Sequence, residues 1–368
     1  MRRKPILVVL MALALAAGAC ASESGETETT IDGGSSETTI QAGEFNGEGV
    51  LQPLESGFPN QPITILVVDD PGSDDSIYAS QLQVQLQKRS PVRINVEHRG
   101  DFSNFGTWEA LAWVIDQEGG MEGYIPLIYT MPGGIIDLLV IDMETEVGVG
   151  LDDLGVILNT EQTPYVIHQC ADAPWGDTLS DMVEYAKDNP NTVRYISGGA
   201  GGGQDAAMQW YIRQLGITVD TIIGGGTSDR ALAVAACDGD VTVSPPAVVL
   251  PHFEGGKVEV TMISGSNPSP APWEDVPNAT ASGMPDDVLG IQWRGSAVPA
   301  GVPAENLAWL EKLWREAASD PEFVELRGHV PGATHVLSGP EETKEFGQKA
   351  YDVALPIMQE MGVYWADQ

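Results

Sequence analysis

The sequence predicts an α/β fold in two lobes, built mainly on parallel sheets. Short runs of apolar and β-branched residues alternate with helical stretches, which is typical of strand–helix–strand units. The alternation falls into two blocks, and a third stretch, roughly 285–368, is largely helical toward its end. The length of 368 residues fits two compact lobes, and an apolar fraction of 42% is enough for a sizeable core.

The first block of strands and helices begins near Phe58-Pro59. Its opening run, ITILVV, is nearly continuous in apolar residues, as expected for a strand that is covered on both faces. An Asp-rich loop follows this run, and Asp75 or Ser76 is a suitable N-cap for the next helix. The elements expected here are strands at 63–68 and 92–97 and helices at 77–87 and 107–117.

The second block repeats the alternation. The strands expected in it lie at 165–168, 193–196, 219–223 and 241–244, and the helices at 179–187, 204–215 and 229–236. Ligands of open α/β sheets bind beyond the carboxyl ends of the strands, so a site is expected in the loops that follow the strands.

The N-terminal residues predict export. A positive segment, MRRK, precedes an apolar segment at 6–17 that is too short to span a bilayer comfortably. The residues AGAC that follow resemble a bacterial lipobox, whose cysteine is lipidated after cleavage. We expect residues 1–20 to be a lipoprotein signal peptide, with Cys20 anchored at the outer face of the cytoplasmic membrane. An ordinary secretory signal is the alternative.

Residues 21–57 are expected to be a disordered acidic tether. They are rich in Glu, Thr, Ser and Gly and contain no Lys or Arg. Such a segment cannot bury enough apolar surface to offset its ordering entropy, and its charge keeps it extended. It would hold a domain away from a membrane.

The charge of the chain excludes nucleic acid and anionic lipid surfaces as partners. Fifty-three acidic residues face 18 basic ones, which gives a formal net charge of −35. A field of this sign repels polyanions.

Two cysteines, Cys170 and Cys237, follow Cys20. An exported protein can oxidise such a pair to a disulfide. Two buried free thiols fit the sequence equally well, because the sequence does not place the residues within bonding distance.

Glycine-rich loops in the second block indicate an anion site. Residues 197–203 (SGGAGGG) and 224–228 (GGGTS) each connect a strand to a helix. Glycine lets backbone N–H groups approach a ligand closely, and a helix N-terminus favours an anion. A phosphate or dinucleotide loop is disfavoured, because no Gly-Lys-Ser/Thr follows and Asp220 precedes a strand instead of ending one. Together the loops predict a nest of donors for a carboxylate.

The residue pattern does not support an enzyme or a metal centre. The five His residues form no hydrolase or zinc-ligand motif, and no carboxylate pair stands out. The Asp-rich loop at 69–76 suggests calcium, but it lacks the spacing and closing Glu of an EF-hand. We expect no catalysis, no cofactor and no metal. A secreted enzyme on the same fold and a cation binder are the alternatives.

Six segments resemble, in order, the motifs of one receptor family. They are FPNQPITILVVDDPGSDDS, VEHRGDFSNFGT, DNPNTVRYISGGAGGGQD, VVLPHFEGGKVEVTMISG, EDVPNATASGMP and WRGSAVPAGVPAE. They are similar to motifs of the extracytoplasmic solute receptors of tripartite tricarboxylate transporters, the Bug receptor family. No single motif is specific, and their shared order over nearly all of residues 58–365 carries the resemblance.

The resemblance implies a type II periplasmic-binding architecture, in which a ligand lies between two lobes that close by hinge motion. Lobe 1 would comprise residues 58–161 and 285–368 and lobe 2 residues 162–284, with crossing segments near 158–164 and 284–294. Carried over by position, the ligand contacts of the first lobe would be Ser73, Ser76, Ser103, Asn104 and Thr107. Those of the second lobe would be Ser197, Gly199, Gly203, Gln204 and Thr227.

The resemblance also implies the function of a receptor that captures a small carboxylate-bearing ligand for a membrane transporter. Its partners would be the ligand, the permease subunits and the membrane through the lipid anchor, and the receptor itself would be a monomer. A binding protein that reports to a signalling partner would have the same fold and is the alternative.

Some positions depart from the family pattern. Asp69 and Asp70 of the first loop (69–76) replace small and aromatic residues, and the second loop (99–107) loses its glycines at 101–103. Asp205 replaces the usual His at the end of the third loop, which begins at residue 197. Like charges raise the cost of a desolvated site, so an acidic first lobe disfavours a tricarboxylate. A monocarboxylate, an amino acid with its own ammonium group, or an aromatic acid is easier to accommodate.

Overall fold

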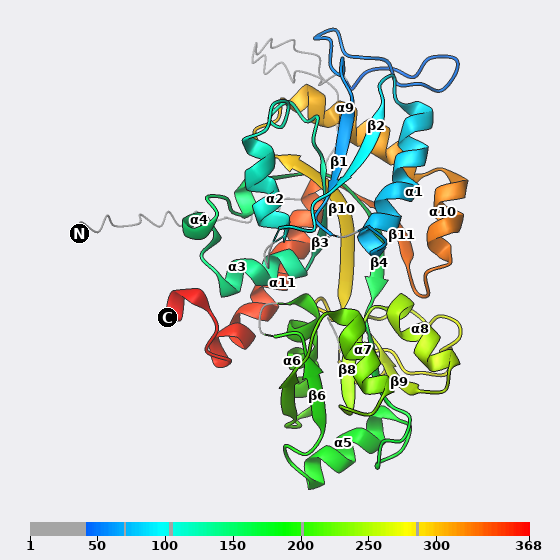
Figure 1. The fold of residues 1–368 in the computed structure, drawn as a ribbon, viewed down its shortest axis with the longest axis vertical. Helices are drawn as coiled ribbons and strands as arrows, with labels where there is room; N and C mark the ends of the chain where they lie inside the picture. Colours follow the sequence, from blue (N-terminus) through cyan, green and yellow to red (C-terminus); the bar gives the residue numbers. More distant parts are fainter. Residues whose placement is uncertain (1–41, 70, 103–105, 200–201, 285–286) are drawn as a thin grey trace, which may run out of the picture. The chain divides into compact units, whose positions relative to one another are not determined.

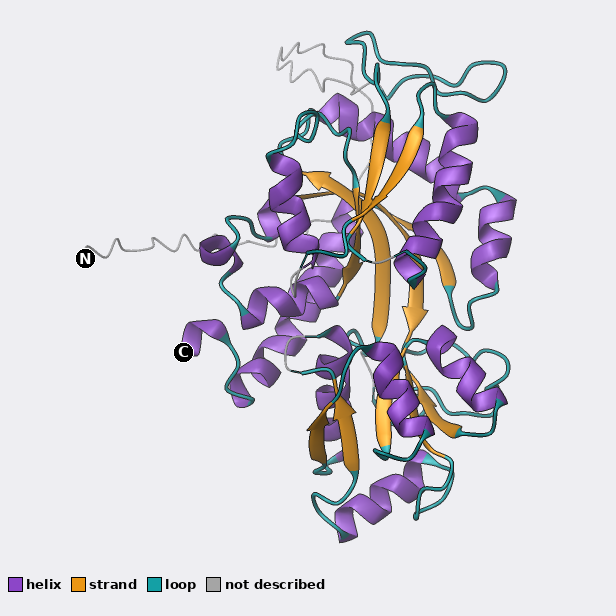
Figure 2. Cartoon of the chain, viewed as in Figure 1, coloured by secondary structure: helices purple, strands orange, loops and turns teal. Residues whose placement is uncertain are grey.

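The computed structural model describes residues 42–69, 71–102, 106–199, 202–284 and 287–368. The expected signal peptide with Cys20, and the tether as far as residue 41, lie outside these residues. The described part of the chain forms two sheets in two lobes, which are shown in Figures 1 and 2. None of its helices is long and apolar enough to cross a membrane.

The first sheet has the strand order β11-β4-β10-β3-β1-β2. Its strands are β1 (Ile63–Val67), β2 (Ile94–His98), β3 (Leu127–Met131), β4 (Leu154–Pro164), β10 (Ile291–Pro299) and β11 (Thr334–Ser338). The helices of this lobe are α1 (Asp74–Arg89), α2 (Gly106–Ile115), α3 (Gly133–Val140), α4 (Met143–Glu146), α9 (Ala304–Ala318), α10 (Pro321–Gly328) and α11 (Pro340–Glu360). Two 3-10 turns, η1 (Leu151–Asp153) and η2 (Trp365–Asp367), complete the described elements of this part.

The second sheet has the strand order β7-β6-β8-β5-β9. Its strands are β5 (Val166–Cys170), β6 (Arg194–Ser197), β7 (Asp220–Ile223), β8 (Val241–Ser244) and β9 (Val258–Ile263). Its helices are α5 (Leu179–Asp188), α6 (Gly203–Leu215), α7 (Thr227–Ala235) and α8 (Pro246–Glu254). The alternation of strands and helices expected from the sequence is confirmed in both blocks. Most elements begin and end within a few residues of the expected positions.

Both faces of β1 are covered, as its nearly continuous apolar run predicts. Ile63, Ile65 and Val67 pack in the cluster that contains the buried side chains of α1 and α9. Leu66 points the other way and packs in the cluster of Trp108 on α2. The alternation of side chains along the strand therefore buries its apolar residues on both faces, and only Thr64 is polar and partly exposed.

The N-cap expected at Asp75 or Ser76 is wrong. Helix α1 starts earlier, and Ser73 is its N-cap, with the Ser73 hydroxyl accepting a hydrogen bond from the Ser76 N–H at 3.1 Å. Asp74 and Asp75 then lie in the first turn, where carboxylates interact favourably with the helix dipole.

The sheets are mixed, which corrects the expectation of mainly parallel sheets. In the first sheet β1 is parallel to β2 and β3, whereas β10 runs antiparallel to β3 and to β4. In the second sheet β6 is parallel to β7 and β8, whereas β5 runs antiparallel to β8 and β9. The reason is the connection of the lobes. Strand β4 leads out of the first lobe through Tyr165 into β5, and β10 leads back into the first lobe beside β4. Strands β4 and β10 must therefore run in opposite directions.

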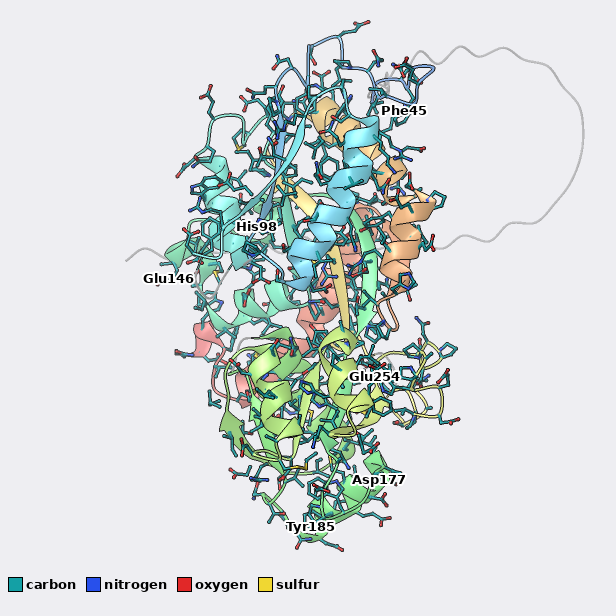
Figure 3. All side chains as sticks on the ribbon, turned by 45° about the vertical axis from the view of Figure 1, so that its right-hand side comes forward. Phe45, His98, Glu146, Asp177, Tyr185 and Glu254 are labelled. Atoms are coloured by element: carbon teal, nitrogen blue, oxygen red, sulfur yellow. A yellow bond between two sulfur atoms is a disulfide. The ribbon has the colours of Figure 1, made fainter. Side chains whose placement is uncertain are left out.

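The ordered chain begins before residue 58, which corrects the C-terminal end of the expected tether. Leu51 is fully buried against the α9 side of the first lobe, and its N–H bonds to the Arg89 carbonyl at 2.9 Å. The Trp309 indole N–H donates to the Gln52 carbonyl at 2.9 Å, and Phe45, labelled in Figure 3, lies under the Lys312 ammonium. A few apolar residues in an otherwise polar segment are therefore enough to dock it.

Cys170 and Cys237 form a disulfide, which settles the choice that the sequence leaves open. Cys170 ends β5 and Cys237 follows α7, and their Cα atoms are 5.3 Å apart. The bond closes a loop of 67 residues across the second lobe.

Removal of this disulfide is expected to destabilise the second lobe. For a loop of this length, replacing both cysteines with Ser lowers the free energy of unfolding by about 2–5 kcal/mol, because the unfolded chain regains entropy. Guanidinium denaturation of the wild type and of Cys170→Ser/Cys237→Ser, each with and without dithiothreitol, measures the effect. Reductant lowers the midpoint of the wild type alone. Equal midpoints for the wild type and the variant in the absence of dithiothreitol would contradict a disulfide between Cys170 and Cys237.

Candidate functional site

A cavity of about 280 Å³ lies where β3, the β4–β5 connection, β10 and the N-termini of α6 and α7 meet. The first lobe contributes Thr130 and Gly133, and the strands that join the lobes contribute Tyr165 and Gln292. The second lobe contributes four glycines, Gly198, Gly199, Gly202 and Gly203. It also contributes four side chains, Gln204, Asp205, Thr227 and Arg230. The cavity lies at the carboxyl end of β6, which is where open α/β sheets bind ligands.

Both helices that begin at the cavity start without a side-chain cap. Gly202 is the N-cap of α6 and Gly226 that of α7, and neither offers an acceptor to the first backbone N–H groups. The first four N–H groups of a helix have no intrahelical partner, and the helix dipole adds partial positive charge there. Two uncapped helix ends therefore present donors to an anion in the cavity.

Arg230 is the positive charge of the cavity. It lies in the first turns of α7 and is only 7% exposed. Its Nη2 donates to Gln204 Oε1 at 2.7 Å and to Thr227 Oγ1 at 3.3 Å, and its Nη1 donates to the Gly225 carbonyl at 3.2 Å. These acceptors are all neutral, and no ion pair joins Arg230 to a carboxylate of the residues that the structure describes. A guanidinium has five N–H donors, so two are left for a ligand.

The glycine at position 198 leaves the space that Arg230 fills. A Cβ atom on Gly198 would lie 2.1 Å from Nη1 of Arg230, so any larger residue would displace the guanidinium. Gly203 has a related role between the lobes, because its Cβ would lie 3.1 Å from the Cα of Gly133. The glycines of the third loop are thus required for close approach as well as for free N–H groups.

Asp205 places a second charge in the cavity, only 3% exposed. Its Oδ1 accepts hydrogen bonds from the hydroxyls of Tyr195, at 2.8 Å, and Ser197. Burial raises the pKa of Asp205, while the two hydroxyls and the charge of Arg230 act in the opposite direction. The Ser197 hydroxyl also accepts a hydrogen bond from the Gly199 N–H at 2.9 Å, which fixes the turn of the loop.

Two polar groups from the strands that join the lobes face the cavity without a fixed partner. The Tyr165 hydroxyl and the Gln292 amide form no hydrogen bond to another described residue, and both residues line the cavity. Burial raises the pKa of Tyr165 above its usual value, so the phenol stays protonated and can donate.

The structure brings together part of the set of contacts expected from the sequence. Gly199, Gly203, Gln204 and Thr227 line the cavity, and Ser197 lies beneath it as a partner of Asp205. Thr107 lies half-buried in the first turn of α2 and does not line this cavity. Ser103 and Asn104 lie outside the described residues.

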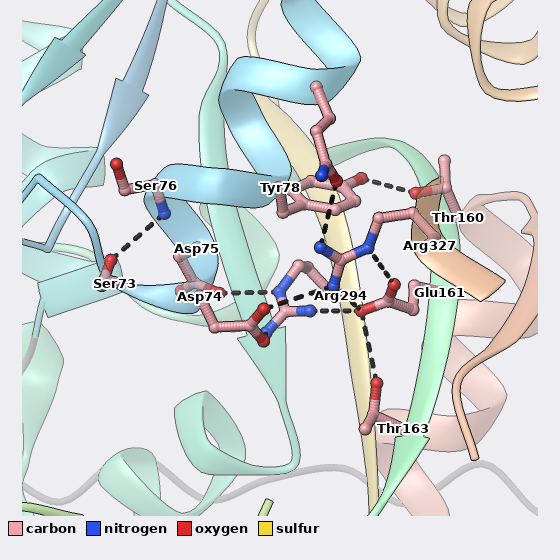
Figure 4. Close-up of polar contacts among 11 residues, drawn as sticks. Ser73, Asp74, Asp75, Ser76, Tyr78, Thr160, Glu161, Thr163, Arg294 and Arg327 are labelled. Carbon is pink, nitrogen blue, oxygen red and sulfur yellow. Dashed lines mark hydrogen bonds and ion pairs between the residues drawn. The ribbon is translucent and has the colours of Figure 1, made fainter. Parts of the chain in front are cut away.

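Ser73 and Ser76 do not line the cavity either, because α1 uses their hydroxyls. Ser73 caps the helix, and the buried Ser76 hydroxyl bonds to His98 Nε2 at 2.8 Å and accepts from the Gly72 N–H at 3.1 Å. Figure 4 shows both serines beside the start of α1.

Arg230, Tyr165 and Gln292 line the cavity but were not expected from the sequence. A sequence signal existed only for Arg230, which is a rare basic residue in an acidic chain and comes two residues after the glycine-rich loop 224–228. Tyr165 and Gln292 are separated from the loops in sequence and reach the cavity only through the strands that join the lobes.

Two acids of the first loop, Asp74 and Asp75, are paired with arginines in the structure. Arg294 on β10 donates to Asp75 at 2.6 Å and also bonds to Asp74 and Glu161. Arg327 on α10 bonds to Glu161 through Nη2 at 2.9 Å and pairs with Asp74 at 3.3 Å. Figure 4 shows this five-residue ionic cluster, which joins α1 to β4 and β10.

Protonation within the ionic cluster follows from burial and pairing. Burial acts against the charge of Arg294, but Asp75, Asp74 and Glu161 outweigh it and raise the pKa of the guanidinium. Burial also opposes ionisation of Asp74, yet Arg294 and Arg327 hold its pKa below the usual value. For the more deeply buried Asp75 burial prevails, and its pKa is raised.

No group of three or more His, Cys, Asp or Glu residues within the described ranges could hold a metal ion. The carboxylates of Asp74 and Asp75 are engaged by arginines instead.

Comparison with known proteins agrees with this geometry. Residues 143–363, more than half of the chain, match the model of the tripartite tricarboxylate transporter family receptor. A UPF0065 protein of Bordetella pertussis is 22% identical over 306 residues, which cover 83% of this chain and 91% of that protein.

Solved structures show the same fold. The periplasmic binding protein BugD is similar with a TM-score of 0.67 and 19% identity, over 83% of this chain and 99% of that chain. MatC (Rpa3494) from Rhodopseudomonas palustris with bound malate has a TM-score of 0.63 and 18% identity, over 81% and 100% of the two chains. R. palustris Rpa4515 with adipate has a TM-score of 0.65 and 15% identity, over 83% and 98%.

The fold and the cavity between its lobes define a two-lobed solute-binding protein. The chain belongs to the tripartite tricarboxylate transporter receptor family, whose members are binding proteins and not enzymes.

The ionic cluster is expected to be a major source of stability. Replacing Arg294 with Met leaves the buried Glu161 and the partly buried Asp75 with fewer partners, which lowers the free energy of unfolding by about 3–5 kcal/mol. The matched control is Lys88→Met, which removes an exposed pair with Glu322 and changes this energy by less than about 1 kcal/mol. Urea denaturation at neutral pH compares the two. Equal effects would contradict the role of the cluster.

Proposed function

We propose that the protein is an extracytoplasmic receptor that captures a small carboxylate-bearing ligand for a tripartite tricarboxylate-type membrane transporter. The observation that carries the proposal is Arg230, a buried guanidinium with neutral partners in a cavity between the lobes. A buried charge is costly unless it is paired, and a carboxylate ligand supplies the missing partner.

The binding mode follows from the donors that remain. The carboxylate would lie across the guanidinium of Arg230 and the uncapped N-termini of α6 and α7. Gln204 and Thr227 hold the guanidinium in place, since Gln204 Nε2 also donates to Thr227 Oγ1 at 3.0 Å. Charge-assisted bonds to a planar guanidinium are short and directional, which suits recognition of a carboxylate.

The ligand would be small. A cavity of about 280 Å³ lies at the lower end of the range of ligand pockets. The relatives crystallised with malate and adipate show ligands of this size in proteins of the same fold. Ser73, Ser76, Ser103, Asn104 and Thr107 of the first lobe remain predicted ligand contacts for the state in which the lobes are closed, and Ser103 and Asn104 lie outside the described residues.

The proposed location is outside the cytoplasmic membrane, with a lipid anchor at Cys20. The lipobox-like N-terminus, the disulfide and the periplasmic location given for BugD support export. The acidic segment between Cys20 and residue 42 would tether the two lobes to the membrane. Family membership supports delivery of the ligand to permease subunits.

Loss of the Arg230 charge is expected to abolish carboxylate binding. Arg230→Met weakens binding by about 100-fold or more, because a desolvated ion pair is lost. The control, Lys257→Met, removes an exposed charge from the same lobe and leaves the affinity unchanged. Calorimetric titration of the full chain with mono- and dicarboxylic acids, malate and adipate included, measures both variants. Full affinity in Arg230→Met, at an unchanged melting temperature, would overturn the proposal.

The lipid anchor is tested by fractionation of cells. Cys20→Ser removes the acceptor thiol, so the protein is expected to move from the membrane fraction to the soluble extracytoplasmic fraction. Metabolic labelling with a radioactive fatty acid provides a second measurement, and the variant should carry no label. A wild-type protein that is unlabelled and already soluble would favour an ordinary secretory signal.

A further inference from the structure

The cavity holds two buried charges of opposite sign that are not bonded to each other. Arg230 is 7% exposed and Asp205 3% exposed, and both line the same cavity. They are close enough for the charge of Arg230 to act on the Asp205 carboxyl, yet no ion pair between them is formed. Direct pairing is what two such neighbours would ordinarily adopt, so their separation needs an explanation.

The third loop keeps the two charges apart. Ser197 bonds to Asp205, whereas the next residue, Gly198, faces the guanidinium of Arg230. Likewise Gln204 bonds to Arg230, and its neighbour Asp205 points to the hydroxyls of Tyr195 and Ser197. Consecutive residues thus hold the acid and the base on opposite sides of one short backbone segment.

Asp205 is arranged as an acceptor with one oxygen still available. Both hydroxyl partners donate to Oδ1, and Oδ2 forms no hydrogen bond to any residue that the structure describes. Donors on one oxygen stabilise the ionised carboxylate, and the other oxygen is left to accept a bond from whatever fills the cavity.

We propose that the ligand carries a protonated amino group beside its carboxylate, and that Asp205 is the residue that selects this group. The inference rests on the proposed function, because Arg230 takes the carboxylate. An α-amino acid has both charges on one carbon atom, so a single ligand bridges the two buried groups that the loop keeps apart.

The charges around the cavity favour such a zwitterion. Arg230 and Asp205 together are neutral, and the ionic cluster nearby contains three carboxylates and two guanidiniums. The field of the ionic cluster reaches the cavity, since the pKa of Tyr165 responds to Arg294 and Asp75 as well as to Arg230. A dicarboxylate would place its second negative charge in these surroundings, whereas a zwitterion adds no net charge.

The residue at position 205, which departs from the family pattern, also favours a ligand with an amino group. Where the resemblance leads us to expect His, this chain has Asp205, which replaces a neutral or positive ring by a carboxylate. An acceptor of this kind offers no donor to a second carboxylate, but it is a strong partner for an ammonium group.

Matched pairs of ligands test the proposal. The pairs are L-glutamate and glutarate, L-leucine and 4-methylpentanoate, and L-phenylalanine and 3-phenylpropanoate, each titrated calorimetrically into the full chain. At least one amino acid is expected to bind about 30-fold or more tightly than its deaminated partner. Asp205→Asn removes this preference by weakening the amino acid, while the deaminated acid keeps or gains affinity. The control Asp229→Asn, an exposed acid of the same helix as Arg230, leaves the preference intact.

The outcomes separate this inference from the proposed function. Equal affinity for both members of every pair, with binding that still needs Arg230, would overturn the selection of an amino group and leave the carboxylate receptor standing. A preference that persists in Asp205→Asn would assign the selection to another residue and overturn the role of Asp205. Binding of neither class would overturn both proposals. Unchanged melting temperatures of the variants exclude misfolding as the cause.

Discussion

The charge of Arg230, buried without a carboxylate partner, is the constraint on which the site in the second lobe depends. A guanidinium in such surroundings is tolerated only if neutral acceptors take its protons, and Gln204, Thr227 and the Gly225 carbonyl do so. Those acceptors come from two loops, so the charge fixes the loops to each other. The absence of a side chain at Gly198 follows from the same requirement.

In the first lobe, buried carboxylates rather than a buried cation need partners, and arginines of the same lobe supply them. Glu161 and Arg294 lie opposite each other on the strands that join the lobes, and α1 begins with two carboxylates beside them. Arg294 and Arg327 pair with these carboxylates inside the lobe, so both guanidiniums have carboxylate partners without a ligand. In the second lobe, Arg230 has no carboxylate partner among the described residues. This asymmetry supports the proposal that the anionic group of a ligand binds in the second lobe.

The sequence predicts what is local and misses what is distant. The strand at 63–67 and the glycine-rich loops were recognisable, because periodicity and turn chemistry lie within a few residues. The partners of Asp75 and Asp74 are more than two hundred residues away, so the acids looked unpaired in the sequence. The return of β10 beside β4 likewise depends on how the lobes connect, which is why the mixed pairing was missed. Tyr165 and Gln292 line the cavity for the same reason, because they lie on the segments that connect the lobes.

The overall charge and the local charge of the protein act on different length scales, and together they constrain the ligand. A net charge of −35 repels anions at long range, although salt limits this field to about 8 Å at physiological ionic strength. In the proposed binding mode, contact with Arg230 in the cavity holds the carboxylate of the ligand. A dianion would be opposed on approach and again by Asp205 after entry, whereas a zwitterion would be opposed at neither stage. A strongly acidic receptor whose cavity contains one guanidinium and one carboxylate would thus be better matched to a ligand without net charge than to a polycarboxylate.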